Sequence, residues 1–201
     1  TTPTGRRLTA PLPFSAFSAF SFTLTVPLNL VGQSGAHLIG GFIFKEGAAS
    51  FSMKGVMLDG AASVDNAFEV ADAAVQMSSF SLKDCDVKAF KNRLFYMGQT
   101  ASVTSLEFSG NVVTGVDGGD FTSGDFIDIR KGTALALKVR GNTFSNAIRT
   151  FARVDAAVVM NSAVIANNTF YNLCYVDSKD NNGILHFRSS SLLEAKALDV
   201  S

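Results

Sequence analysis

Val139-Arg140-Gly141-Asn142-Thr143-Phe144 is one of five related six-residue stretches whose recurrence decides the fold. The other four are Met53-Lys54-Gly55-Val56-Met57-Leu58, Leu82-Lys83-Asp84-Cys85-Asp86-Val87, Phe108-Ser109-Gly110-Asn111-Val112-Val113 and Ile165-Ala166-Asn167-Asn168-Thr169-Phe170. They end at residues 58, 87, 113, 144 and 170, so the spacings are 29, 26, 31 and 26 residues. A period of this length is typical of a solenoid, in which each unit buries its apolar face by stacking on its neighbours. Any function is then expected along outer rows made of one residue per repeat.

Each repeat contains an alternating strand, a turn rich in Asn, Asp or Gly, and a second alternating strand. Successive repeats have the same phase, which favours parallel stacking over hairpins that reverse direction. Parallel stacking brings Phe144 over Phe170 inside and Asn142 over Asn168 at a corner, where side-chain amides satisfy one another along the axis. The sequence therefore predicts an all-β fold, a right-handed parallel β-helix (solenoid) with coils of about 26–31 residues.

The amino-terminal region is unusually apolar, and this difference in composition predicts two parts of the chain. Residues 8–44 contain no Asp, Glu, Lys or Arg, but Pro11, Pro13 and Pro27 argue against a membrane-spanning helix. Alternation from Phe20 to Leu30 predicts strands instead. We expect residues 1–49 to form capping strands or the first coils, and residues 50–201 to form the β-helix coils of a larger protein. An additional domain or a protein partner is expected to cover the apolar strands, because such an edge would otherwise aggregate.

The formal charge limits the class of partner. The 17 basic residues are balanced by 17 acidic residues, which argues against nucleic acid or an anionic membrane as a general partner.

Four stretches resemble a known family: 124–132, 141–146, 149–155 and 167–172, which include Gly141-Asn142-Thr143-Phe144-Ser145-Asn146 and Asn167-Asn168-Thr169-Phe170-Tyr171-Asn172. They are similar to pectate-lyase-like β-helix domains of unknown function from surface proteins of Bacteroidota that are associated with polysaccharide utilisation. The resemblance covers roughly residues 50–175. It implies a secreted or outer-membrane cell-surface location and a role with a polysaccharide or oligosaccharide.

Outward-facing residues of the second strand form a candidate binding strip. If Ile127 and Ile129 point inward, their polar neighbours point outward, and the same holds one repeat later. The strip consists of Tyr96, Phe126, Asp128, Arg130, Phe151, Arg153 and Asp155. Alignment places Asp128 on Arg153, Arg130 on Asp155 and Phe126 on Phe151. Two interpretations remain open, a salt-bridge ladder and an aromatic and polar strip that binds a sugar chain.

A long loop offers a candidate calcium site. Asp117, Asp120 and Asp125 lie within one glycine-rich insertion and carry the oxygen ligands that calcium prefers. Their spacing does not match an EF-hand, and Gly-Asp loops are also ordinary turns. The alternative is a plain corner loop, so no cofactor is required and calcium is the one candidate.

Catalysis is disfavoured by missing motifs. Phe144 follows Asn142-Thr143 where a polygalacturonase would need an acid, and the chain has no Asp-Asp pair and no Gly-His-Gly. We therefore expect a noncatalytic glycan-binding or scaffold domain that captures polysaccharide. The alternatives are a polysaccharide lyase on acidic glycans, with Arg130 or Arg153 binding uronate and Lys131 as base, and a structural subunit of a surface complex.

Overall fold

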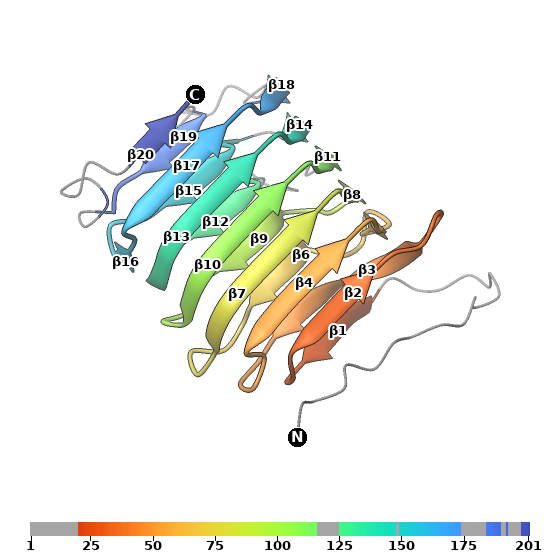
Figure 1. Cartoon of the computed structure of the whole chain (residues 1–201), viewed down its shortest axis with the longest axis horizontal. Coiled ribbons are helices and arrows are strands. Elements are labelled where there is room, and N and C mark those ends of the chain that lie inside the picture. The colour runs from red at the N-terminus through yellow and green to blue at the C-terminus, as the bar shows by residue number, and fades with distance from the viewer. Residues whose placement is uncertain (1–19, 116–124, 148, 174–183, 190–191, 193–197) are drawn as a thin grey trace.

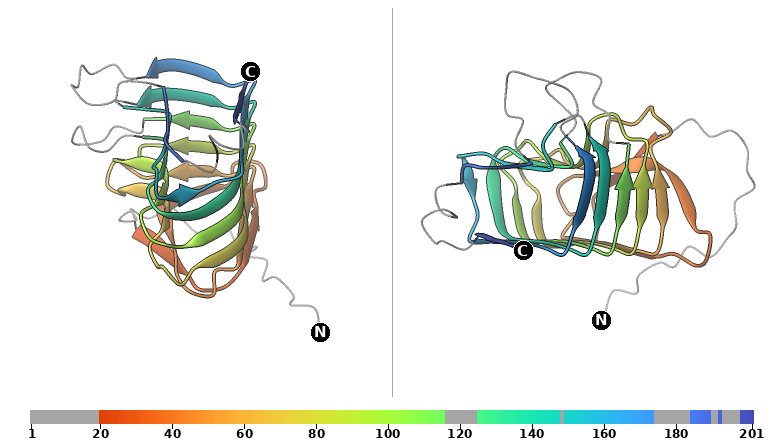
Figure 2. Two further views of the ribbon diagram at one scale, coloured as in Figure 1. Left: turned by 90° about the vertical axis from the view of Figure 1, so that its left-hand side faces the viewer. Right: turned by 90° about the horizontal axis from the view of Figure 1, so that it is seen from above.

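The computed structural model describes residues 20–115, 125–147, 149–173, 184–189, 192 and 198–201. Within these residues the chain forms twenty strands, and every pairing between them is parallel. The strands lie in three rows along the length of the molecule, two of which are joined into one sheet through a shared strand (Figures 1 and 2). The prediction of an all-β fold with parallel strands is thereby confirmed.

Each row collects one strand from successive repeats. Row A contains β1 (Phe20–Leu24), the second half of β3 (His37–Phe44), β6 (Asn66–Val70), β9 (Arg93–Met97), β12 (Ile127–Ile129), β15 (Ala152–Val154) and β19 (Leu185–Phe187). Row B contains β2 (Leu28–Val31), β4 (Ser50–Lys54), β7 (Gln76–Lys83), β10 (Ser102–Ser109), β13 (Gly132–Arg140), β16 (Val158–Val159), β17 (Ser162–Ala166) and β20 (Leu198–Val200). Row C contains the first half of β3, β5 (Met57–Asp59), β8 (Asp86–Lys88), β11 (Val112–Thr114), β14 (Thr143–Ala147) and β18 (Thr169–Leu173).

The register of these rows matches the repeat in the sequence. In row C, Leu58 pairs with Val87, Val87 with Val113, Val113 with Phe144 and Phe144 with Phe170. These are the final residues of the five six-residue stretches. The spacing of the repeat is therefore the spacing between paired strands.

The structure has three strands in each repeat where the sequence analysis expected two. Each six-residue stretch is divided by a residue with positive φ, which turns the chain from row B into row C. These residues are Gly55, Asp84, Gly110, Gly141 and Asn167. Gly, Asn and Asp occupy this region of backbone conformation at the lowest steric cost, and a short strand follows the turn in every case.

A column of phenylalanine rings fills the space between the rows. Phe51, Phe80 and Phe108 of row B are buried, and Phe80 lies between its two neighbours at centroid distances of 5.4 and 5.3 Å. Row A contributes Phe68 and Phe95, whose rings meet Phe80 edge-on at 5.1 and 5.0 Å. Edge-on and offset contacts of this kind add to the gain from burying apolar area.

A line of asparagine side chains runs through the corner between rows B and C. Asn111 and Asn142 are buried, and each donates its Nδ2–H to a row B carbonyl and to the next Asn side chain. Asn168 continues the line by donating to Val139 O at 2.9 Å. The predicted stacking of Asn142 on Asn168 is confirmed, and the corner is held by side-chain amides as well as by backbone pairing.

The described part of the amino-terminal region continues the same rows. β2 pairs with β4, and β3 pairs with both β5 and β6. Phe20, Val26 and Val31 are exposed at this end of the molecule. Among the helices of the described residues, none has the length and apolar character needed to cross a membrane.

Candidate ligand-binding face

The outer surface of row A carries the candidate site. Tyr96 of β9 pairs with Asp128 of β12, Asp128 with Arg153 of β15, and Arg153 with His186 of β19. A second column, two residues further along the chain, consists of Arg130, Asp155 and Arg188. The backbone N–H groups of these residues donate to the carbonyl oxygens of Met97, Ile129 and Val154, respectively. We call the whole set the arginine face: Arg93, Tyr96, Asp128, Arg130, Arg153, Asp155, His186 and Arg188.

Asp128 is the buried centre of the first ion cluster. Its side chain is 0% exposed, and its two oxygens are bound by different arginines. Arg93 Nε donates to Oδ2 at 2.6 Å, and Arg130 Nε donates to Oδ1. An isolated buried carboxylate would be costly, but two charge-assisted hydrogen bonds offset the loss of hydration. Asp128 therefore holds two guanidinium groups in place.

Asp155 is the centre of a second, more accessible cluster. Arg153 donates from Nε at 3.0 Å and from an Nη at 3.2 Å, and Arg188 donates to Oδ1 at 2.8 Å. Arg130 reaches the same carboxylate at 3.9 Å, which links the two clusters. Partial burial acts to raise the pKa of Asp155, but the hydrogen bonds from Arg153 and Arg188 outweigh it and lower the pKa below its ordinary value. The expected pairing of Arg130 with Asp155 is confirmed.

Tyr96 and His186 add an aromatic ring and an imidazole to the arginine face. The Arg93 guanidinium lies 4.4 Å from the centroid of the Tyr96 ring, in a cation–π contact. Burial, together with the positive charges of Arg188 and Arg153, lowers the pKa of His186. Its Nδ1 is buried and has no hydrogen-bond partner among the described residues. Because Nδ1 is enclosed by protein, a ligand can form a hydrogen bond with this imidazole only through Nε2.

The arginine face has an excess of positive charge although the whole chain is neutral. Four guanidinium groups surround two carboxylates, which leaves two positive charges uncompensated within the set. The Arg188 side chain is 51% exposed and those of Arg93 and Arg153 are each 13% exposed. Arg188 is therefore the guanidinium most open to a ligand, and its planar fork matches a carboxylate or a sulfate.

The prediction is wrong for two residues of the strip, Phe126 and Phe151, which lie in the core. A third residue, Asp128, lies on the outer side of its strand but is not accessible. Phe126 and Phe151 are both 0% exposed and contact Phe144 inside the core at 5.1 and 4.7 Å. β12 and β15 begin one residue after each phenylalanine, so strict alternation does not extend to the preceding corner. Asp128 does lie on the outer side of β12, but its arginine partners cover it. The ring centroids of Phe126 and Phe151 do lie close together, 6.5 Å apart, but within the core.

The predicted calcium site is not assembled by the described residues. Asp117 and Asp120 lie outside them, and Asp125 is 0% exposed. Asp125 Oδ1 accepts hydrogen bonds from the backbone N–H and the hydroxyl of Thr150, and Arg149 Nε lies 4.0 Å away. Burial raises the pKa of Asp125, while the hydrogen bond with Thr150 acts to lower it. Across the described ranges no group of three His, Cys, Asp or Glu side chains is arranged to hold a metal ion.

Sequence reasoning missed three members of the arginine face, Arg93, His186 and Arg188. His186-Phe187-Arg188 repeats the polar, apolar, polar order of Arg153-Val154-Asp155 and could have extended the strip by one repeat. Arg93 gives no such signal, because it stands at the start of β9 and reaches Asp128 through its long side chain. Lys131, the base considered for a lyase, is exposed and forms no ion pair with the described residues of the arginine face.

Comparison with known proteins assigns no family. The chain matches no protein-family model, no curated protein and no solved structure. The similarity to pectate-lyase-like domains therefore remains a prediction from the sequence stretches quoted above, and the chemistry of the arginine face is the basis for a functional proposal.

Proposed function

We propose that this chain is a noncatalytic module of an exported bacterial surface protein that captures polysaccharide through the arginine face. We propose with it that the rows are the walls of a right-handed parallel β-helix with coils of about 26–31 residues. The order row B, row C, row A recurs in each repeat, and each strand pairs with its equivalent in the next repeat. That succession supports a solenoid.

The observation that carries the functional proposal is the excess of arginine around Asp155. Arg153 and Arg188 share one carboxylate that cannot neutralise both, and Arg130 approaches it as well. Arg130 and Arg188 lie on either side of Asp155 in one column, two parallel-strand spacings or roughly 10 Å apart. Arg153 lies in the neighbouring column on the strand between them, so guanidinium groups recur along a linear ligand. Uronic-acid or sulfated glycans carry anions at regular intervals, so we propose an acidic polysaccharide as the ligand class.

Tyr96 and His186 fit the same ligand. An aromatic ring can pack against the apolar face of a sugar, and because the Nδ1 of His186 is buried, Nε2 is the imidazole nitrogen that can form a hydrogen bond with a hydroxyl. Cation–π contact with Arg93 fixes the Tyr96 ring on this surface. These contacts supply recognition of the sugar itself, whereas the arginines select its charge.

The lyase alternative requires a base beside a bound uronate. Arg130 and Arg153 are already engaged by Asp128 and Asp155, and Lys131 lies outside those two ion clusters. The third alternative, a structural subunit, would use the exposed apolar side chains Phe20, Val26 and Val31 at the amino-terminal end. These alternatives make different predictions for purified protein.

A glycan array probed with the purified chain tests the proposal. We expect acidic glycans to bind and neutral glycans to bind more weakly, with the signal reduced in Arg188→Ala and unchanged in Lys91→Ala, a lysine outside the arginine face. The same glycans are then incubated with the chain and followed by the ultraviolet absorbance of unsaturated uronate. Release of that product would establish the lyase, and an array without any bound glycan would reject the capture module in favour of a structural role.

A further inference from the structure

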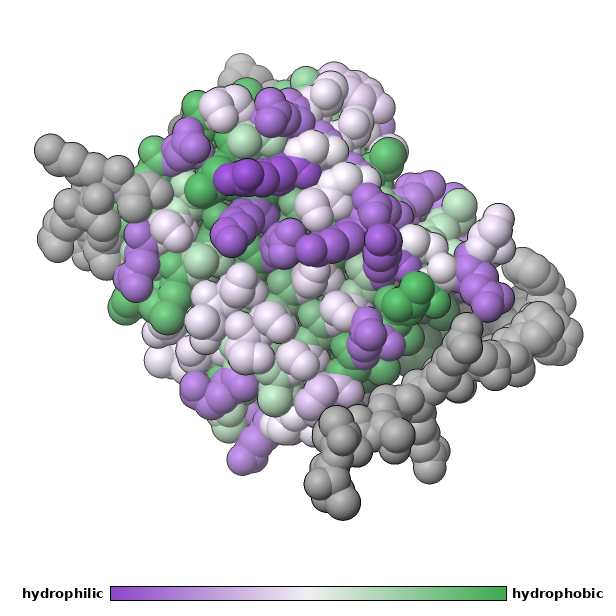
Figure 3. Space-filling view, viewed as in Figure 1, coloured by the Kyte–Doolittle hydropathy of each residue, from purple (hydrophilic) through white to green (hydrophobic). Residues whose placement is uncertain are grey.

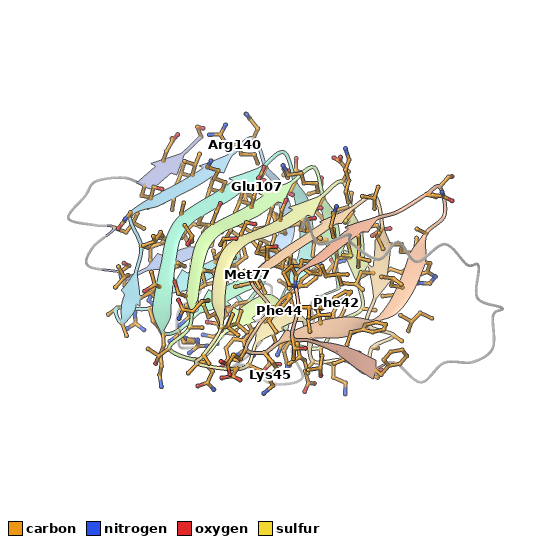
Figure 4. All side chains as sticks on the ribbon, turned by 60° about the horizontal axis from the view of Figure 1, so that its bottom comes forward. Phe42, Phe44, Lys45, Met77, Glu107 and Arg140 are labelled. Carbon is orange, nitrogen blue, oxygen red and sulfur yellow. The ribbon has the colours of Figure 1, made fainter. Side chains whose placement is uncertain are left out.

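The outer surface of row B has a groove between the carboxyl ends of β10 and β13. Glu107, Phe108 and Ser109 line it on one strand, and Lys138 and Arg140 line it on the next. The pairing of these strands sets Glu107 beside Lys138 and Ser109 beside Arg140. Figure 4 shows Glu107 and Arg140 toward the same end of the row, away from Phe42 and Phe44 of the core. The groove belongs to row B, so it is separate from the arginine face on row A.

The cations of the groove are not neutralised by its single acid. Glu107 is bound by Lys83 of β7 at 3.0 Å, so its negative charge is already matched. Within the described residues neither Lys138 nor Arg140 forms an ion pair, and both side chains are exposed. Two adjacent cations without a counter-ion repel each other, and an anion bound between them removes that repulsion.

A hydroxyl group and an open volume complete the groove. Ser109 lies on the outer side of β10 in register with Arg140, and a hydroxyl can donate to an anionic oxygen. The hollow measures about 240 Å³, several times the roughly 30 Å³ that one water molecule occupies in the liquid. It therefore has room for an oxyanion and for part of the molecule that bears it.

The surface beside the groove favours a sugar as the bearer of the oxyanion. Ser50, Ser79 and Ser105 are paired across β4, β7 and β10, and Ser52 pairs with Ser81 in the adjacent column. Figure 3 shows this pale, weakly polar surface next to the strongly hydrophilic side chains at the end of the row. Rows of hydroxyls without bulky side chains leave a flat surface that can exchange hydrogen bonds with sugar hydroxyls.

We propose that this groove is a second binding site, which takes a sulfate or carboxylate group of a saccharide between Lys138 and Arg140. The site does not depend on the function proposed for the arginine face. Charge-assisted hydrogen bonds from the two cations hold the oxyanion, Ser109 supplies a neutral donor, and Glu107 stays bound to Lys83.

An amide-resolved NMR titration of the whole chain with inorganic sulfate, and separately with glucose 6-sulfate, tests this site. We expect saturable shifts of the amides of Ser109, Lys138 and Arg140 with both probes. The double variant Lys138→Gln, Arg140→Gln is expected to bind each at least about tenfold more weakly, which corresponds to about 1.4 kcal/mol. Lys54→Gln, a matched exposed lysine outside the groove, is expected to bind as the wild type does.

The same titration shows whether the groove acts independently of the arginine face and which ligand it prefers. Arg188→Ala is expected to keep the sulfate shifts at Ser109 and Arg140, even if it loses glycan binding on the array. Tighter binding of glucose 6-sulfate than of inorganic sulfate would support a saccharide as the natural ligand. The absence of saturable shifts at these amides, or an unchanged affinity in the double variant, would overturn the proposal.

Discussion

Asn142 accepts both the backbone N–H and the side-chain amide of Asn111 on its Oδ1, at 2.9 and 2.8 Å. Its own Nδ2 donates to Phe108 O at 3.0 Å and to the Asn168 side chain at 2.9 Å. One buried side chain thus joins three repeats at the corner between rows B and C. The asparagine line therefore ties rows B and C together along the molecular axis.

Replacement of Asn142 is expected to destabilise the whole chain. Asn142→Ala leaves the backbone N–H and the side-chain amide of Asn111 without their acceptor in a buried corner, and each unsatisfied group costs about 1–3 kcal/mol. We expect a loss of about 2–4 kcal/mol in the free energy of unfolding, measured by urea denaturation. Asn29→Ala is the control, because its hydrogen bond with Ser52 lies on the surface and its backbone does not have positive φ. Equal losses in the two variants would contradict a special role for the buried amide line.

Cys85 occupies the asparagine position of its repeat. Its N–H donates to Asn111 Oδ1 at 3.0 Å, and its thiol lies 3.7 Å from Met53 O, the register equivalent of the Leu82 carbonyl that Asn111 binds. Burial raises the pKa of the Cys85 thiol, which keeps it protonated. We expect Cys85→Asn to extend the line by one amide and to raise the unfolding free energy by about 1 kcal/mol. A thermal melt would contradict this if the variant unfolded well below the wild type.

The repeat and its register could be predicted from the sequence because both depend on local rules. A residue that tolerates positive φ, with an inward apolar residue three positions later, recurs at each corner. Three of the five corners also carry an Asn directly after the first residue, and Asn142-Thr143-Phe144 and Asn168-Thr169-Phe170 show the pattern most clearly. Parallel pairing follows once equal phase brings like residues together. The columns Tyr96–Asp128–Arg153 and Arg130–Asp155 follow from the same register.

The sequence does not show which residues of the strip are buried, because burial depends on where each strand starts. Phe126 and Phe151 precede their strands by one residue, and at a corner two consecutive side chains can both point inward. Asp128 faces outward as alternation requires, but the reach of Arg93 across the row buries it. Alternation gives the side of a strand, whereas burial depends on long side chains from neighbouring repeats.

The arginine face is expected to contribute stability that depends on pH. The pKa of Asp155 is lowered in the folded chain, so its contribution is complete above the ordinary value of 3.8 and is lost as pH falls through the folded value. Asp155→Asn should therefore cost about 1–3 kcal/mol near neutral pH and progressively less in acid. Urea unfolding of both proteins across this range measures the difference. The matched change Glu46→Gln, at an exposed carboxyl, should show no such trend, and a constant deficit for Asp155→Asn would refute the ionic origin.

The phenylalanines that were expected outside are expected to behave as core residues. Phe151 contacts Phe144 at 4.7 Å and Phe170 at 4.8 Å, and its side chain is fully buried. Phe151→Ala should lower the free energy of unfolding by about 3–5 kcal/mol through lost burial and a residual cavity. Tyr171→Ala, at a ring that is 53% exposed, should cost far less. Comparable melting temperatures for the two variants would contradict the placement of Phe151.

The central claim, capture of an acidic polysaccharide by the arginine face, is tested most directly by a dissociation constant. The ligand is the acidic oligosaccharide that binds best on the array, and it is titrated calorimetrically into the wild type and into Arg188→Ala. A second series repeats both titrations with proteins that also carry Lys138→Gln and Arg140→Gln, so that the row B groove cannot supply the signal. We predict that Arg188→Ala weakens binding at least about tenfold in both series, because one charge-assisted pair is lost. Equal dissociation constants with and without Arg188, or an array on which no acidic glycan binds, would contradict the claim.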